Sequence, residues 1–188
     1  MIADPELLAA LDRVDAFRQD TSEPVFDDAD LQAVAGSPEK VHALIVIAAD
    51  QRGPLARRYA AAEAIAQSGH IETLASDAEA ARAVATMLAE AMTRDEIHNR
   101  WGLPGHFVGG TGKLLLALRP GLREALLPLL GDERPLVIIG SEAATLNHSH
   151  RYCIRDLASY LLAVEQGVPW QDEPDPAVRD RNIERLRS

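Results

Sequence analysis

Recurrent helix-start signals constrain the fold of this chain most strongly. Asp4-Pro5-Glu6, Ser37-Pro38-Glu39 and Asp175-Pro176 each place a capping residue before a proline. Proline is favoured at the first helical position, because the N–H that it lacks would have no intrahelical partner there. Ser76-Asp77-Ala78-Glu79 has the spacing of a capping box, with Ser76 as the cap. Five or more separate helices are therefore predicted.

The apolar residues that follow these starts recur at the helical period. In the first segment Leu7, Leu11 and Val14 share a face, with Phe17 one turn further on. Similar stripes run through four other segments: Leu55–Ala66, Ala81–Met92, Leu122–Leu129 and Ile154–Leu161. The hydrophobic content is 47% and rich in alanine and leucine, whereas aromatic residues make up only 4%, which favours helices over a β-sandwich. We predict an all-α protein of about eight to ten helices.

Two segments rich in β-branched residues leave an α/β fold as the alternative. Ala43–Ala48 and Leu136–Ile139 each have the composition of a buried strand. Ser37-Pro38 favours a buried helix from about residue 38 to 51 for the first segment. Pro135 and Gly140 bracket the second, which we interpret as a short extended piece or a connector. Two isolated strands do not build a doubly wound sheet.

Length and charge bound the organisation and the partners. A chain of 188 residues fits a single domain, and we expect one helical repeat-like domain over residues 1–188. The formal net charge of -10 repels phosphate, so no nucleic-acid partner is expected. Asp4 and Glu6 interrupt any signal peptide, and the apolar runs are too short to span a bilayer. We therefore expect a soluble, cytoplasmic protein that does not bind membranes.

The single cysteine, Cys153, cannot form a disulfide within the chain. It stands between Tyr152 and Ile154 in an apolar segment. A thiol in such surroundings is typical of a buried structural residue rather than of a nucleophile.

Val108-Gly-Gly-Thr-Gly-Lys113 has part of a phosphate-loop pattern. The full pattern needs a glycine five residues before Gly112 and a hydroxyl residue after the lysine, and these positions hold Phe107 and Leu114. We interpret the segment as the start of a helix with Thr111 as its cap, and we expect no nucleotide cofactor.

His148-Ser-His150 could set two imidazoles on one side of an extended segment, as metal ligands require. His106, Glu142 and Asp156 are candidates to complete such a site, but nothing in the spacing demands it. We interpret both histidines as surface residues of a loop and expect no bound metal. Ser141, which lacks the flanking glycines of a nucleophile elbow, is interpreted as a helix cap.

The loop that follows the Ala81–Met92 stripe holds the candidate partner-binding residues. Trp101, His106 and Phe107 lie among glycines and prolines, and large amphipathic rings in such loops are common interface anchors. We predict that these three residues contact a partner. The alternative is that Trp101 fills the core between helix ends.

Two C-terminal segments carry a resemblance to a known architecture. Pro120-Gly-Leu-Arg-Glu-Ala-Leu-Leu-Pro-Leu-Leu-Gly-Asp132 and Tyr152-Cys-Ile-Arg-Asp-Leu-Ala158 are similar to HEAT-like helical repeats, and Val41–Ala66 resembles them more loosely. The resemblance implies stacked helical hairpins in an α-α superhelix that binds partners, and it carries over no catalytic residue. It also implies that Arg155 and Asp156 are structural and pair with neighbouring groups.

A weak internal repeat agrees with this resemblance. Arg58-Tyr59 with Glu63 matches Arg151-Tyr152 with Asp156. The spacing, 151 − 58 = 93 residues, corresponds to two units of about 46 residues. Chance similarity between amphipathic helices is the alternative explanation.

We therefore expect a non-enzymatic binding or scaffold module with an acidic surface, for example an immunity-type or regulatory binder. Its partner would be another protein with a basic patch, attracted by the negative charge. The alternative is a small-ligand-binding protein or an enzyme that uses residues 101–113 with His148 and His150.

Overall fold

The computed structural model describes residues 4–14 and 25–187 of the chain. It is 68% helical, and eleven α-helices and one two-stranded sheet lie among the described residues. The all-α prediction is therefore confirmed, and the α/β alternative is set aside. Phe17, the last residue of the first predicted stripe, lies outside the described residues.

Six α-helices precede the small sheet. They are α1 (Pro5–Asp12), α2 (Asp28–Ala35), α3 (Pro38–Ala49), α4 (Leu55–Gln67), α5 (Ile71–Ser76) and α6 (Ala78–Met92). The sheet is the antiparallel pair β1 (Gly102–Leu103) and β2 (Phe107–Val108). The elements that follow are α7 (Gly110–Ala117), α8 (Arg119–Leu126), the 3-10 helix η1 (Leu127–Gly131), α9 (Ser141–His150), α10 (Ile154–Gln166) and α11 (Pro176–Arg187).

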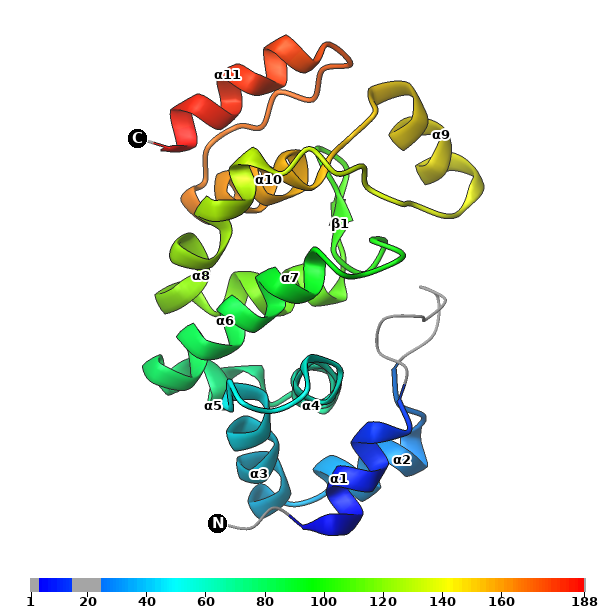
Figure 1. Cartoon of the computed structure of the whole chain (residues 1–188), viewed down its shortest axis with the longest axis vertical. Helices are drawn as coiled ribbons and strands as arrows, with labels where there is room; N and C mark the ends of the chain where they lie inside the picture. Colours follow the sequence, from blue (N-terminus) through cyan, green and yellow to red (C-terminus); the bar gives the residue numbers. More distant parts are fainter. Residues whose placement is uncertain (1–3, 15–24, 188) are drawn as a thin grey trace.

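The helices are arranged along one long axis (Figure 1). Helices α1 and α2 lie at one end and α10 and α11 at the other, with α6 near the middle. Within this arrangement α3 packs on α4, α6 packs on α8, and α10 packs on η1 and α11. None of the described helices has both the length and the apolar character needed to cross a membrane.

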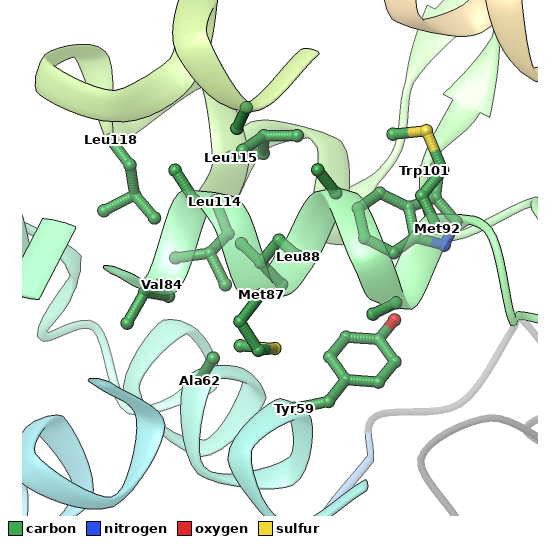
Figure 2. Packing of buried hydrophobic residues seen from close by; sticks show 14 of the residues in the cluster. Tyr59, Ala62, Val84, Met87, Leu88, Met92, Trp101, Leu114, Leu115 and Leu118 are labelled. Carbon is green, nitrogen blue, oxygen red and sulfur yellow. The ribbon is translucent and has the colours of Figure 1, made fainter. Parts of the chain in front are cut away.

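Helix α6 lies at the centre of the core because its apolar stripe is buried on several sides (Figure 2). Val84, Met87 and Leu88 are at most 1% exposed. They meet Ala62 of α4 on one side and Leu114 of α7 on another. Since each buried leucine or methionine side chain stabilises a fold by about 1.5–3 kcal/mol, this central stripe holds the neighbouring helices together.

The predicted proline-associated caps are confirmed. The Asp4 carboxylate accepts from the Glu6 N–H at 2.9 Å, and Ser37 Oγ accepts from the Lys40 N–H at 3.4 Å. Asp175 accepts from the Ala177 N–H at 2.9 Å. Local side-chain chemistry therefore sets these helix starts.

Three other predicted caps are wrong by one or two residues. Asp77, not Ser76, caps α6, because Asp77 Oδ1 accepts from the first N–H groups of that helix while Ser76 ends α5. Gly109 precedes α7 in place of Thr111, and Gly140 precedes α9 in place of Ser141. Asp77 caps through its side chain, whereas Gly140 has a positive φ of 95° that suits glycine.

The two segments rich in β-branched residues behave as interpreted. Ala43–Ala48 lies within α3. Leu136–Ile139 is an extended connector, held where the Val137 N–H donates to His98 Nδ1 at 3.1 Å and the Ile139 N–H donates to Asn99 Oδ1 at 2.8 Å. Side chains thus satisfy backbone groups that a sheet would otherwise pair.

The proposed internal repeat does not join equivalent positions. Arg58 and Tyr59 lie inside α4, whereas Arg151 ends α9 in the left-handed region at φ 53° and Tyr152 precedes α10. Chance similarity explains the match better. The HEAT-like superhelix remains a prediction.

Candidate functional site

The loop between α6 and α7 folds around two glycines with positive φ. Gly102 (φ 127°) lies in β1 and Gly105 (φ 77°) in the turn that leads to β2. A Cβ atom on Gly102 would lie 2.5 Å from the carbonyl oxygen of Phe107. Glycine is therefore required for the two short strands to approach so closely.

Trp101 lies in the core, so its prediction as an exposed anchor is wrong. It is 0% exposed and stacks on Tyr59, with ring centroids 5.9 Å apart and an interplanar angle of 23° (Figure 2). Its Nε1–H donates to Asp95 Oδ2 at 2.9 Å. The loop closes over α4 and α6 and carries the indole inward, which is the alternative weighed from the sequence.

Asp95 has an altered acidity. Burial raises the pKa of its carboxyl to about 6, and the hydrogen bond from Trp101 offsets this only in part. Asp95 is thus neutralised at a higher pH than an ordinary aspartate.

A buried polar network lies beneath the loop. Glu63, 4% exposed, accepts from Thr111 Oγ1 and from the Arg100 guanidinium, each at 2.5 Å. Tyr59 Oη lies 3.4 Å from Thr111 Oγ1. Burial, and next the Glu63 charge, raise the pKa of the Tyr59 hydroxyl well above its usual value. The network ties α4 to the start of α7, and we interpret it as structural because its two charges, Glu63 and Arg100, pair with each other.

His106 and Phe107 lie at the surface, as a binding role requires. Phe107 is 39% exposed. His106 Nε2 lies 3.0 Å from Asp172 Oδ2 in the segment between α10 and α11. His106 therefore also holds its own loop to this segment, while Phe107 remains the open aromatic residue of the predicted set.

Asp172 also lies close to a second histidine, His150, and to Tyr152. Tyr152 Oη donates to Asp172 Oδ1, and His150 Nε2 lies 3.8 Å from the same oxygen. The His150 ring stacks on Tyr152 at 5.0 Å between centroids. Burial and the Asp172 carboxylate raise the pKa of Tyr152 above its usual value. Both carboxylate oxygens are thus used within the protein, which is typical of a structural cluster.

The alternative site with residues 101–113, His148 and His150 is assembled only in part, because the His106 and His150 rings lie 6.5 Å apart beside Asp172 while His148 does not join them. Both residues lie at the C-terminal end of α9 rather than in a loop. His150 faces Asp172, whereas His148 lines a separate hollow with Arg151 and Cys153. Over residues 4–14 and 25–187, no three His, Cys, Asp or Glu side chains gather in a way that could hold a metal ion.

The phosphate-loop resemblance at Gly109–Lys113 fails for a geometric reason. The Gly109 N–H donates to the Trp101 carbonyl at 3.1 Å. The N–H groups of Thr111 and Gly112 donate to the Arg100 carbonyl at 2.9 and 3.3 Å. Amides that cradle phosphate must point to an open site, and these point to backbone oxygens instead.

An open groove of about 720 Å³ runs along the N-terminal half of α6. We name it the α3–α6 groove. It is lined by His42, Ile45, Val46, Ala49, Asp50, Gln51, Asp77, Glu79, Ala80, Arg82, Ala83 and Thr86. Val46 is 47% exposed, and the lining contains three acidic residues and a single arginine. The groove therefore joins apolar side chains to a surplus of negative charge.

Sequence reasoning missed this groove and several buried polar anchors. His98 is 3% exposed, accepts from the Val137 N–H through Nδ1, and therefore donates through Nε2 to the Met92 carbonyl at 3.1 Å. Burial lowers its pKa. Arg179, within a charged helix, gave no signal of burial. The i, i+4 spacing of Val46 in α3 and Asp50, the residue after its last turn, was the one local sign of the groove.

Comparisons with known proteins give no relationship on which to draw: no family model, no curated protein and no solved structure matches this chain.

Proposed function

We propose that this chain is a cytoplasmic, non-enzymatic binding module that docks a basic amphipathic segment of another protein in the α3–α6 groove. The observation that carries the proposal is that one groove is lined by the exposed Val46 and by three carboxylates, those of Asp50, Asp77 and Glu79. An immunity-type inhibitor or a regulatory binder would have this form.

The groove suits such a segment chemically. Ile45, Ala80 and Ala83 supply apolar lining. The exposed side chain of Val46 adds an apolar surface that a partner could bury. A helix laid into a groove presents apolar residues at the i, i+3 and i+4 positions, and its lysine or arginine side chains reach the rim. The net charge of -10 would accelerate the encounter with a cationic partner.

The loop residues that the sequence predicted to contact a partner, Trp101, His106 and Phe107, do not belong to the α3–α6 groove. Trp101 is buried and so supplies no contact surface. The loop also begins at the C-terminal end of α6, whereas the groove runs along its N-terminal half. A role for His106 and Phe107 in partner binding remains a separate prediction.

A designed peptide tests the proposal without knowledge of the natural partner. The probe is a fluorescent amphipathic Lys/Leu helix of about four turns, compared with a Glu/Leu helix of the same pattern. Asp50→Asn with Glu79→Gln removes two rim charges while leaving an amide oxygen at each position. We expect this double variant to bind the Lys/Leu peptide at least about tenfold more weakly by fluorescence anisotropy.

Glu124→Gln with Glu142→Gln is the matched control, because both residues are exposed and lie outside the groove. It changes the net charge equally and should leave the affinity within about threefold. Equal loss in both double variants, or equal binding of the Glu/Leu helix, would show that the attraction is not specific to the groove. A photocrosslinker at Val46 then captures the cellular partner. The same crosslinker at Val164, which is exposed but outside the groove, is the control. The captured partner is tested for binding to the same two double variants.

A further inference from the structure

A second hollow lies between α10, the segment that follows it and α11. Its volume is about 310 Å³, at the lower end of the range for small-molecule sites. It is lined by Ala163, Gln166, Val168, Pro169, Trp170, Gln171, Asn182, Arg185 and Leu186. No residue of the α3–α6 groove takes part in it.

Trp170 lines this hollow and carries an unsatisfied donor. Its ring meets Tyr160 edge to face, with centroids 6.0 Å apart. Its Nε1 atom is buried and has no hydrogen-bond partner among the residues described. A buried indole N–H normally finds an acceptor, and leaving one unpaired costs free energy. A ligand with an acceptor oxygen would recover this free energy once a small rotation of the indole turns Nε1 toward the hollow.

The charge of the lining is opposite to that of the chain. The whole chain has 29 acidic residues against 19 basic ones, yet the described residues that line this hollow include Arg185 and no carboxylate. Arg185 donates to the side-chain oxygen of Asn182, which is 3% exposed and itself donates to the Gln171 carbonyl at 3.1 Å. The guanidinium is thereby oriented by a buried amide, and guanidinium groups match carboxylates in geometry and charge.

The remaining lining is apolar and small. Ala163, Val168, Pro169 and Leu186 contribute aliphatic surface to the same hollow. A compact hydrocarbon or aromatic body would bury its surface there, and the volume is too small for a peptide with several side chains.

From these features we infer that this hollow, the Trp170 pocket, binds a small carboxylate with a flat apolar body. The carboxylate accepts from Trp170 Nε1 and faces Arg185, while the body packs on Val168, Pro169 and Leu186. The inference is independent of the proposed protein-binding role.

Hydrocinnamate is the probe, and its neutral isostere hydrocinnamide is the matched ligand control. We expect calorimetry to give a Kd at or below about 1 mM for the acid and binding at least about tenfold weaker for the amide. Equal affinity for the two probes, or no saturable binding of the acid, would overturn the inference.

Indole N–H signals in isotope-labelled protein place the ligand. The chain has two tryptophans, and Trp101 Nε1 already donates to Asp95 at 2.9 Å. The acid should shift the Trp170 signal downfield and leave that of Trp101 in place. A shift at Trp101 alone would assign binding elsewhere and contradict the proposal.

Two variants complete the test. Trp170→Phe keeps an aromatic ring but removes the N–H, and it should weaken hydrocinnamate binding by about tenfold. Arg185→Gln should do the same, whereas Arg181→Gln, four residues earlier on α11 and outside this hollow, should have no effect. If Arg181→Gln weakens binding as much as Arg185→Gln, the attraction reflects the charge of α11 and the assigned pocket is wrong.

Discussion

Arg179 and Asp156 form a buried ion pair in which Nε lies 3.0 Å from Oδ1, and neither side chain is more than 3% exposed. The other carboxylate oxygen accepts from the Cys153 N–H at 2.8 Å. One carboxylate thus caps α10 and also holds α11 on it. The resemblance to HEAT-like repeats implied a structural role for Asp156, and these contacts give it one.

Asp156→Ala should lower the free energy of unfolding by about 3–5 kcal/mol, because it removes the cap and leaves the Arg179 charge buried without its partner. Urea denaturation measures the change. Asp180→Ala is the control, since Asp180 is half exposed and pairs with Arg155 at 3.1 Å, a geometry that contributes less than about 1 kcal/mol. Similar losses in the two variants would remove the distinction between the buried and the exposed pair.

Trp101→Ala should lower the free energy of unfolding by about 3–5 kcal/mol and reduce the melting temperature accordingly, because it empties a fully buried site against Tyr59. Phe107→Ala in the same loop should change stability by less than about 1 kcal/mol, since its ring is 39% exposed. Thermal unfolding of the two variants under the same conditions measures the difference in stability loss between them. A larger loss of stability in Phe107→Ala than in Trp101→Ala would contradict the burial of Trp101.

Asp95→Asn should stabilise the protein at neutral pH. The carboxyl has a pKa of about 6 in the folded chain against an ordinary value of 3.8, so the folded state binds more protons than the unfolded state between these values. The free energy of unfolding therefore falls as pH rises from about 4 to about 6 and stays lower above that range. Asparagine keeps an acceptor for Trp101 without the charge, so the variant should be more stable by about 1–3 kcal/mol near pH 7.

The pH profile of that difference is the decisive measurement for Asp95. Denaturation midpoints of the wild type and Asp95→Asn should converge toward about pH 4, where the buried carboxyl of the wild type is protonated. A difference that is constant with pH would mean that Asp95 ionisation does not affect folding.

Gly109→Ala and Gly110→Ala should have opposite effects although the residues are neighbours. A Cβ atom on Gly109 would lie 2.2 Å from the Arg100 carbonyl oxygen, so the backbone must shift at a cost of about 1–3 kcal/mol. A Cβ atom on Gly110 meets no atom within 4 Å at the start of α7, where alanine favours the helix over glycine by about 0.5–1 kcal/mol. Equal destabilisation by both would contradict the close approach of Gly109 to residue 100.

The sequence by itself determined where helices such as α3 and α11 begin and which face of α6 is buried. Ser37 and Asp175 start helices because a side-chain oxygen satisfies an N–H two or three residues away, an interaction that needs no other part of the fold. The stripe along α6 faces the core for the same local reason, since the helical period alone aligns its apolar residues.

Only the tertiary structure decided what those helices bring together. Asp172 meets His106, Arg179 meets Asp156, and the groove beside Val46 forms where α6 packs near α3. These contacts join residues that are far apart along the chain, and their geometry depends on how each loop directs the next helix. Trp101 shows the consequence most directly, because a loop rich in glycine permits both an exposed and a buried indole, and packing on Tyr59 selects the buried one.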